Sequence, residues 1–304
     1  MGEFMEALLD PAVPFLRYGL IAGLLASVAF GIIGTYVVTR RISYIAGAIS
    51  HCILGGIGPA LYVQKKLGVE WFHAMYGAVA AALLAALIIG LVSMYARERE
   101  DTVIGALWVT GMAVGVLFIW KTPGYVDAMS YLFGNILMIT RRDLWLVGAL
   151  DVVVVALGVA FYNKLLAVCF DEEFALLRGV RVQVYYLLLL CLAALTVVLL
   201  VPVVGIVMVI ALLTLPAAVA GHFSRRLWQM MALSVAFCVL FTSVGLGVSY
   251  TYDLLSGPTI IVLAAAAYLL VIVAVGLRRR LTRPSESKAA EPTPSPPPAA
   301  PQGP

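Results

Sequence analysis

The chain has 304 residues, of which 63% are hydrophobic and only 12% are charged. This composition excludes a soluble domain, which would have to cover its whole exterior with apolar side chains. The formal net charge is +4, and basic loops on the cytoplasmic side of a membrane account for such an excess of Lys and Arg. The charge therefore does not indicate a nucleic-acid partner. The sequence therefore predicts an all-α, polytopic membrane protein.

Apolar segments follow one another along most of the chain. A membrane-spanning helix needs roughly 18 or more predominantly apolar residues. We expect about eight or nine transmembrane helices, taken from the apolar segments 15–39, 44–64, 72–95, 102–120, 143–162, 183–203, 205–222, 227–250 and 258–277. Residues 1–281 are thus predicted to form one transmembrane domain. Residues 282–304 are rich in Pro, Ala, Ser and Glu and are predicted to be a disordered cytoplasmic tail, because they cannot bury a core.

The basic residues between these segments predict how the chain is oriented. Most of them follow the odd-numbered segments: Arg40 and Arg41, Arg97 and Arg99, Lys164, Arg178 and Arg181, Arg225 and Arg226, and Arg278, Arg279 and Arg280. Loops rich in Lys and Arg stay in the cytoplasm, so we expect the N-terminus outside and the C-terminus inside. Lys65, Lys66, Arg141 and Arg142 depart from this rule.

Two breaks interrupt the apolar pattern. Residues 128–139 are too short to span a membrane and contain Gly134-Asn135 midway. A surface or re-entrant half-helix is expected there, because a broken backbone at membrane depth must be buried in protein or line a cavity. Between the sixth and seventh segments, Val201-Pro-Val-Val-Gly205 predicts a sharp reversal with little exposed loop.

A short helix is predicted after the fifth apolar segment. Asp171, Glu172 and Glu173 open it and Gly179 follows it, and acids at the start with Gly at the end are signals that start and stop a helix. We expect an amphipathic helix on the cytoplasmic side. It is either an ordinary connection or a docking element for a cytoplasmic partner.

Two ionisable residues are predicted to lie at membrane depth, where such side chains are costly and mark a functional site by default. His51 lies inside the second apolar segment, and Asp151 is the clearest buried carboxylate. Imidazole suits Zn²⁺ and other transition ions. The alternative is that each side chain only forms a hydrogen bond with a neighbouring helix. Around His51, the residues Gly47, Gly55, Gly56 and Gly58 predict a face on which another helix can pack closely.

Several motifs, in order along the chain, carry a resemblance to a known family. They are Tyr36-Val-Val-Thr-Arg-Arg-Ile-Ser-Tyr44 with Ser50-His51, Glu100-Asp-Thr-Val-Ile-Gly105, Ser130-Tyr-Leu-Phe-Gly134, Val204 to Ala218, Gly245-Leu-Gly-Val-Ser-Tyr250 and Ser256-Gly-Pro258. Over roughly residues 15–280 the chain resembles the membrane permeases of ATP-binding-cassette importers for zinc and manganese. The resemblance implies the compact multi-helix permease fold shared with vitamin B12 and siderophore importers, in a bacterial plasma membrane.

The same resemblance implies partners and a cargo. Such permeases pair with a second permease subunit, which is either identical or different. Their cargo is Zn²⁺ or Mn²⁺, with iron as a further candidate. Cytoplasmic ATPase subunits drive them, and an extracytoplasmic binding protein delivers the metal. No permanently bound cofactor is expected, and the chain lacks a phosphate-binding loop of its own. The short cytoplasmic helix would then be the coupling helix on the ATPase, formed by Asp171, Glu172, Glu173, Phe174, Ala175, Leu176, Leu177, Arg178 and Gly179.

The chain departs from the family pattern at two carboxylates. The family places Asp four residues before the histidine, on the same helix face, where this chain has Gly47. The family's Phe-Gly-Asp motif is replaced in this chain by Phe133-Gly-Asn135. His51, with Asp151 as a replacement carboxylate, is the predicted metal contact. Two alternatives remain: a permease of the same fold for a metal chelate or an organic cofactor, and a membrane enzyme using Asp151 and His51 as acid and base.

Overall fold

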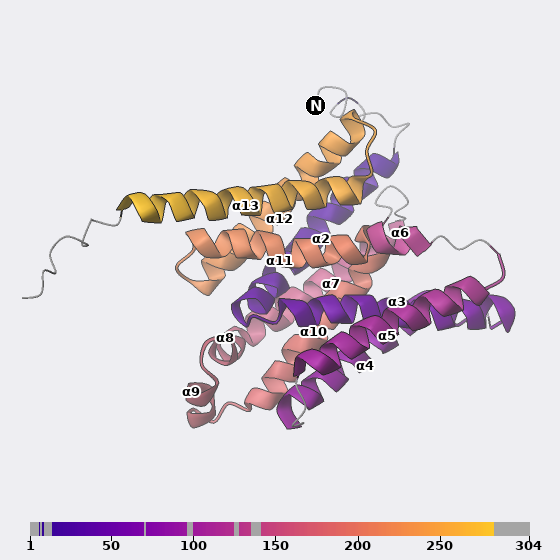
Figure 1. The fold of residues 1–304 in the computed structure, drawn as a ribbon, viewed down its shortest axis with the longest axis horizontal. Coiled ribbons are helices and arrows are strands. Elements are labelled where there is room, and N and C mark those ends of the chain that lie inside the picture. The colour runs from indigo at the N-terminus through magenta and orange to yellow at the C-terminus, as the bar shows by residue number, and fades with distance from the viewer. Residues whose placement is uncertain are drawn as a thin grey trace, which may run out of the picture. The chain divides into compact units, whose positions relative to one another are not determined.

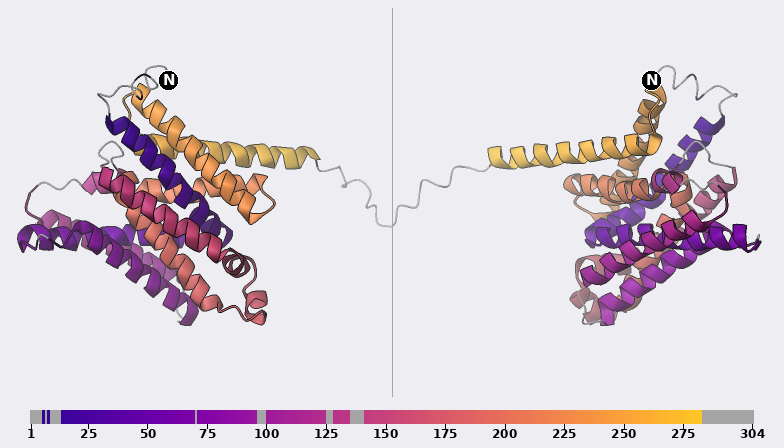
Figure 2. Two further views of the ribbon diagram at one scale, coloured as in Figure 1. Left: turned by 180° about the vertical axis from the view of Figure 1, so that it is seen from behind. Right: turned by 45° about the vertical axis from the view of Figure 1, so that its right-hand side comes forward.

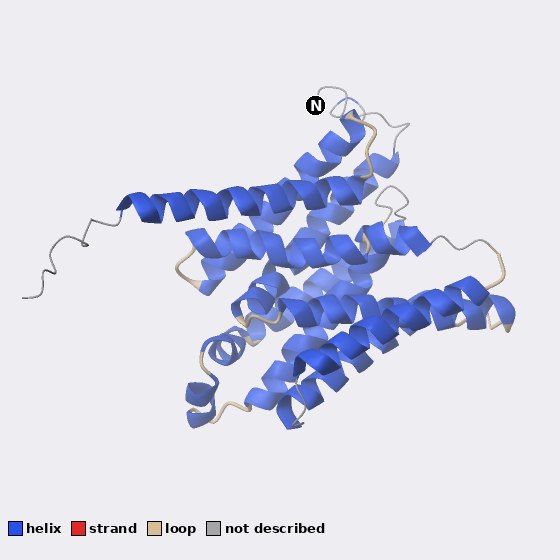
Figure 3. Cartoon of the chain, viewed as in Figure 1, coloured by secondary structure: helices blue, strands red, loops and turns tan. Residues whose placement is uncertain are grey.

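The computed structural model describes residues 14–69, 71–95, 100–124, 128–134 and 141–282, together with Glu6 and Leu8. Within these ranges the regular structure is helical, and no strand is present (Figure 3). Seven helices of the described part are long and apolar enough to cross a membrane, or eight if a bent pair counts as one span. The predicted all-α, multi-pass membrane fold is therefore confirmed.

Each predicted apolar segment corresponds to one long helix. These are α2 (Pro14–Thr39), α3 (Ser43–Lys66), α4 (Ala74–Tyr95), α5 (Glu100–Lys121), α7 (Arg141–Ala160), α10 (Val182–Val204), α11 (Ile206–Phe223), α12 (Leu227–Thr251) and α13 (Ser256–Thr282). Three short helices lie between them, namely α6 (Ala128–Phe133), α8 (Tyr162–Phe170) and α9 (Glu172–Leu177). Helices α7 and α8 form the bent pair, with an angle of 72° between them.

Two groups of helices build the packed unit, which ends at Tyr268 (Figures 1 and 2). Helix α2 packs against α7, α10, α11 and α12, and its side chains Phe30, Ile33 and Tyr36 are fully buried. Helix α3 packs between α4 and α5, and α10 packs on α4. A second unit starts at Leu269 within α13, and the predicted tail after it lies outside the described residues.

The predicted half-helix is present as α6, which ends at Phe133 directly before Gly134, while residues 135–140 lie outside the described part. Gly134 and Gly205 both have positive φ, at 72° and 83°. A Cβ on Gly205 would lie 2.2 Å from the backbone nitrogen of Gly134, so these two backbones touch. The end of α6 therefore packs directly on the break between α10 and α11, where Gly205 alone separates the two helices. Buried protein surroundings of this kind are what a broken helix needs at membrane depth.

Helix α2 ends in a regular C-terminal turn at the arginine pair. The Ile42 amide donates to the Val37 carbonyl at 3.0 Å, and the Arg41 amide donates to the Val38 carbonyl at 3.1 Å. This pattern is a Schellman motif, in which the residue after the helix adopts the left-handed conformation and is usually Gly. Here that residue is Arg41, with φ 62°. The turn therefore carries backbone strain, because a Cβ is disfavoured in this conformation.

Replacing Arg41 with glycine is expected to stabilise the protein by about 1 kcal/mol, since glycine adopts the left-handed conformation without a Cβ penalty. The measurement is thermal unfolding of the purified protein in detergent. Arg41→Lys is the control, because it keeps the Cβ and the charge and should leave the unfolding temperature unchanged. An equal shift in both variants would assign the effect to the guanidinium group instead of the backbone.

Candidate functional site

His51 lies in the middle of α3 and is half-buried. Its ring stacks on the indole of Trp108 from α5, with ring centroids 4.6 Å apart and planes 19° apart. The buried Nδ1 atom has no hydrogen-bond partner among the residues that the structure describes. The alternative was that His51 only forms a hydrogen bond with a neighbouring helix. The structure shows no such bond at Nδ1 among the described residues.

Gly47 borders the same indole. A Cβ on Gly47 would lie 3.4 and 3.5 Å from two ring atoms of Trp108, which is ordinary van der Waals contact. Residues four apart lie on one face of a helix, so Gly47 and His51 present one face of α3 to Trp108. A Cβ at position 47 therefore fits beside the indole of Trp108 without displacing it.

The close-packing face predicted around His51 is also present. A Cβ on Gly55 would lie 2.7 Å from the carbonyl oxygen of Gly111, and one on Gly58 would lie 2.4 Å from that of Gly115. Both partners belong to α5, where Gly111 and Gly115 form the small-residue pattern of closely packed membrane helices. The α3–α5 contact therefore depends on glycine and holds Trp108 against His51.

Asp151 lies on α7, and its side chain is only 7% exposed. The carboxyl group faces the backbone of α2 at Ala29, but neither oxygen completes a hydrogen bond with any described residue. Its helix packs on α2, whereas His51 faces α5. The structure therefore does not bring Asp151 and His51 together, and the metal role of Asp151 stays a prediction.

The other two histidines lie apart from His51. His73 precedes α4, where its Nδ1 atom lies 3.4 Å from the Gln64 amide nitrogen at the edge of a cavity of about 290 Å³. Glu70, which precedes it by three residues, is outside the described residues. His222 lies exposed in the last turn of α11. Among the described residues, no three His, Cys, Asp or Glu side chains gather as metal ligands.

The short helix predicted from its acids is present as α9. The Asp171 side chain caps it by accepting a 2.9 Å hydrogen bond from the Phe174 amide, which satisfies a free donor of the first turn. Gly179 follows it with φ 75°. Ala175 is the buried residue of this helix, while Phe174, Leu176 and Leu177 are 48%, 59% and 87% exposed. These three side chains give α9 an exposed apolar surface.

Sequence reasoning missed two contacts of this site. Nothing in the sequence marks Trp108 as the partner of His51, because helix rotation is decided by packing. The Arg40 guanidinium forms an ion pair with Glu172 at the start of α9, although the two residues are far apart in the chain. A signal for the second contact did exist, since a basic helix end and an acidic helix start were both predicted on the cytoplasmic side.

Comparison with known proteins gives a consistent result. The chain matches the ABC 3 transport family over residues 12–275. It is 42% identical over 249 residues to a probable metal transport system membrane protein of Chlamydia pneumoniae, covering 82% of this chain and 85% of that protein. It is 33% identical over 278 residues to the manganese transport system membrane protein MntC of Halalkalibacterium halodurans, covering 91% and 93%.

A solved structure agrees with the family match. PsaBC from Streptococcus pneumoniae, in complex with Fab, superposes with a TM-score of 0.78 at 29% identity, covering 89% of this chain and 94% of that one. The permease fold that the sequence motifs implied is thus confirmed. With the family match extending over nearly all of its helices, this multi-pass membrane protein belongs to the ABC 3 transport family.

Proposed function

We propose that the chain is the membrane-spanning permease subunit of an ATP-driven importer for divalent metal ions, with Mn²⁺ as the favoured cargo. The observation that carries a transition-metal cargo is His51, a half-buried imidazole at membrane depth whose Nδ1 atom has no partner among the described residues. The names of the relatives support metal as the cargo, and one of them names manganese. Zn²⁺ and iron are the other ions that the motifs suggested, and nothing specific favours a chelate.

His51 would contribute one ligand to a shared and weak site. Imidazole binds first-row transition ions, but a single imidazole holds them only briefly. A transported ion must bind well enough to enter and weakly enough to leave. Pairing with a second permease subunit would bring further ligands to the pathway, and an extracytoplasmic metal-binding protein would deliver the ion. Asp151 is kept apart from this site, because its helix packs on α2.

Helix α9 would receive the cytoplasmic ATPase subunits. Its exposed Phe174, Leu176 and Leu177 offer the apolar contact, and the cation of Arg178 lies 4.7 Å from the centre of the Phe174 ring. ATP binding to the partner would favour one arrangement of the permease over another, as any ligand does that binds two states unequally. The chain itself would act as a transporter, with hydrolysis on the partner.

The test is uptake of radiolabelled Mn²⁺ by vesicles that contain the permease with its ATPase subunits. His51→Ala is expected to lower ATP-dependent uptake several-fold, because it removes the imidazole ligand and leaves the α3–α5 glycine contact in place. His222→Ala is the matched control, since this exposed histidine lies at the end of α11. Unchanged uptake in His51→Ala would remove His51 from the mechanism.

Gly47→Asp provides the converse test. The new carboxylate would lie on the same helix face as His51, in the space beside Trp108. We expect this variant to retain Mn²⁺ more strongly, and so to release it more slowly, than the wild-type complex in equilibrium dialysis. Gly47→Asn, which has the same size without the charge, should not show the increase. Equal retention in both variants would contradict a cation pathway at this face.

A further inference from the structure

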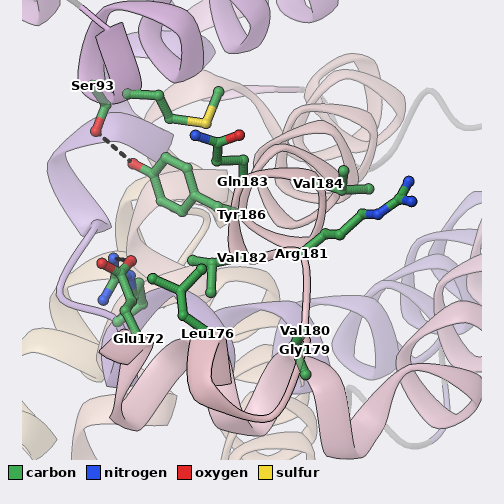
Figure 4. A pocket seen from close by; sticks show the side chains of 12 residues that line it. Ser93, Glu172, Leu176, Gly179, Val180, Arg181, Val182, Gln183, Val184 and Tyr186 are labelled. Atoms are coloured by element: carbon green, nitrogen blue, oxygen red, sulfur yellow. Dashed lines mark hydrogen bonds and ion pairs between the residues drawn. The ribbon is translucent and has the colours of Figure 1, made fainter. Parts of the chain in front are cut away.

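A cluster of four side chains joins α9 to three membrane helices. Arg40, in the turn that ends α2, forms an ion pair with Glu172, the first residue of α9. The Arg40 guanidinium carbon also lies 5.5 Å from the centre of the Tyr186 ring on α10. The Tyr186 hydroxyl accepts a hydrogen bond of 3.5 Å from Ser93 near the end of α4 (Figure 4). We call Arg40, Ser93, Glu172 and Tyr186 the Arg40 cluster.

Helix α9 also packs on α8 and contacts α10, and Ala175 is its buried residue. A cavity of about 640 Å³ is lined by Leu176 of α9 together with residues near the ends of α4 and α10 (Figure 4). Arg40, Ser93, Glu172 and Tyr186 all line this cavity. Within the described part of the chain, the ion pair between Arg40 and Glu172 is a polar contact that connects α9 to the end of α2.

Stability alone does not account for the ion pair. The Arg40 and Glu172 side chains are 25% and 41% exposed, so the pair is partly buried, and the cost of removing the charges from water offsets much of their attraction. The backbone nevertheless holds Arg40 in a defined position, through the Schellman turn and the strained φ of Arg41. Strained backbone that is kept in place often accompanies a functional contact.

Helix α2 is positioned to transmit a displacement of α9 to the other membrane helices. It packs against α7, α10, α11 and α12, so a shift of its cytoplasmic end reaches most of the packed unit. A coupling contact needs two arrangements whose balance both ends influence. The Arg40 guanidinium contacts both Glu172 and Tyr186, so a displacement of α9 would change the ion pair while the contact with α10 remains.

We infer that Arg40 is a positioning residue that transmits displacement of α9 to α2 through its contacts with Glu172 and Tyr186. This inference rests on the proposed function, in which α9 receives the ATPase subunits. Arg40 itself touches neither the metal nor the nucleotide in this account. Loss of the Arg40 guanidinium should therefore uncouple ATP hydrolysis from metal transport, while the permease still assembles with its ATPase subunits.

The test uses the complete complex in vesicles and measures Mn²⁺ uptake and ATP hydrolysis on the same preparation. In Arg40→Gln, we expect uptake per ATP hydrolysed to fall by about two- to thirtyfold, the range that mutations along a coupling network produce. Co-purification of the ATPase subunits should stay at the wild-type level. Arg41→Gln is the matched control, since this neighbouring arginine makes no ion pair with a described residue, and its coupling ratio should be unchanged.

A charge exchange separates transmission from a general effect of charge. Glu172→Arg alone should uncouple the complex as Arg40→Gln does, and Arg40→Glu combined with Glu172→Arg should recover part of the lost coupling. A normal coupling ratio in Arg40→Gln, loss of the ATPase subunits from it, or no recovery in the double variant would each overturn the inference. A wild-type complex without ATP-dependent uptake would contradict the proposed function instead.

Discussion

Replacing Gly115 with alanine is expected to destabilise the protein by about 1–3 kcal/mol, the usual cost of forcing an extra methyl group into a packed interior. The new Cβ would lie 2.4 Å from the carbonyl oxygen of Leu54 and 2.5 Å from its carbonyl carbon. Both atoms belong to the backbone of α3, which cannot move aside as the end of a side chain can. The two helices would have to separate along their whole contact.

Gly105 provides the control on the same helix. Nothing lies within 4 Å of a Cβ built on Gly105, so alanine meets open space there. Gly105→Ala should stabilise α5 by up to about 1 kcal/mol, the difference in helix propensity between the two residues. The measurement is the unfolding temperature in detergent of both variants. If the two shifts had the same sign, the glycine contact between α3 and α5 would not determine the stability of this region.

The same contact links stability to transport. Helix α5 carries Trp108, and the stacking of Trp108 on His51 requires the two helices to stay close. Gly115→Ala is therefore expected to lower Mn²⁺ uptake per folded complex as well. Gly105→Ala should leave Mn²⁺ uptake unchanged. A difference between the two variants would then show that the effect depends on the position of the alanine in the α3–α5 contact.

The sequence predicted the helices well, because their signals are local. Apolar runs of membrane length predicted every long helix, and the acids from Asp171 with Gly179 predicted α9. Even the half-helix at Ala128 could be expected, since a short apolar run with Gly134 cannot span a membrane. Signals of this kind need no knowledge of what each helix packs against.

The contacts of the candidate site could not be predicted in the same way. His51 faces Trp108 because glycines on α3 and α5 fix the rotation of both helices, and helix rotation depends on packing between distant segments. The pairing of Arg40 with Glu172 likewise depends on how α9 folds back toward α2. The predicted link between Asp151 and His51 relied on charge alone, and charge does not indicate which helix a carboxylate faces.

Asp151→Asn is expected to stabilise the protein and to leave Mn²⁺ uptake intact. Its two carboxylate oxygens are buried against the backbone of α2 at Ala29, and neither completes a hydrogen bond of good geometry with a described residue. An unsatisfied buried polar group costs about 1–3 kcal/mol in protein variants, and an unpaired charge costs more. The amide keeps the shape of the side chain and removes the charge, so the unfolding temperature should rise.

Uptake decides between this expectation and the predicted metal role of Asp151. A carboxylate that binds the transported ion would lose most of its affinity on conversion to an amide, because the hard divalent ion prefers charged oxygen. Asp151→Asn would then transport poorly while unfolding at a higher temperature. His51→Ala, measured in the same vesicles, gives the size of a true pathway defect. An Asp151→Asn defect of that size would place a second metal contact between α7 and α2, away from Trp108, and would require the pathway to pass both helices.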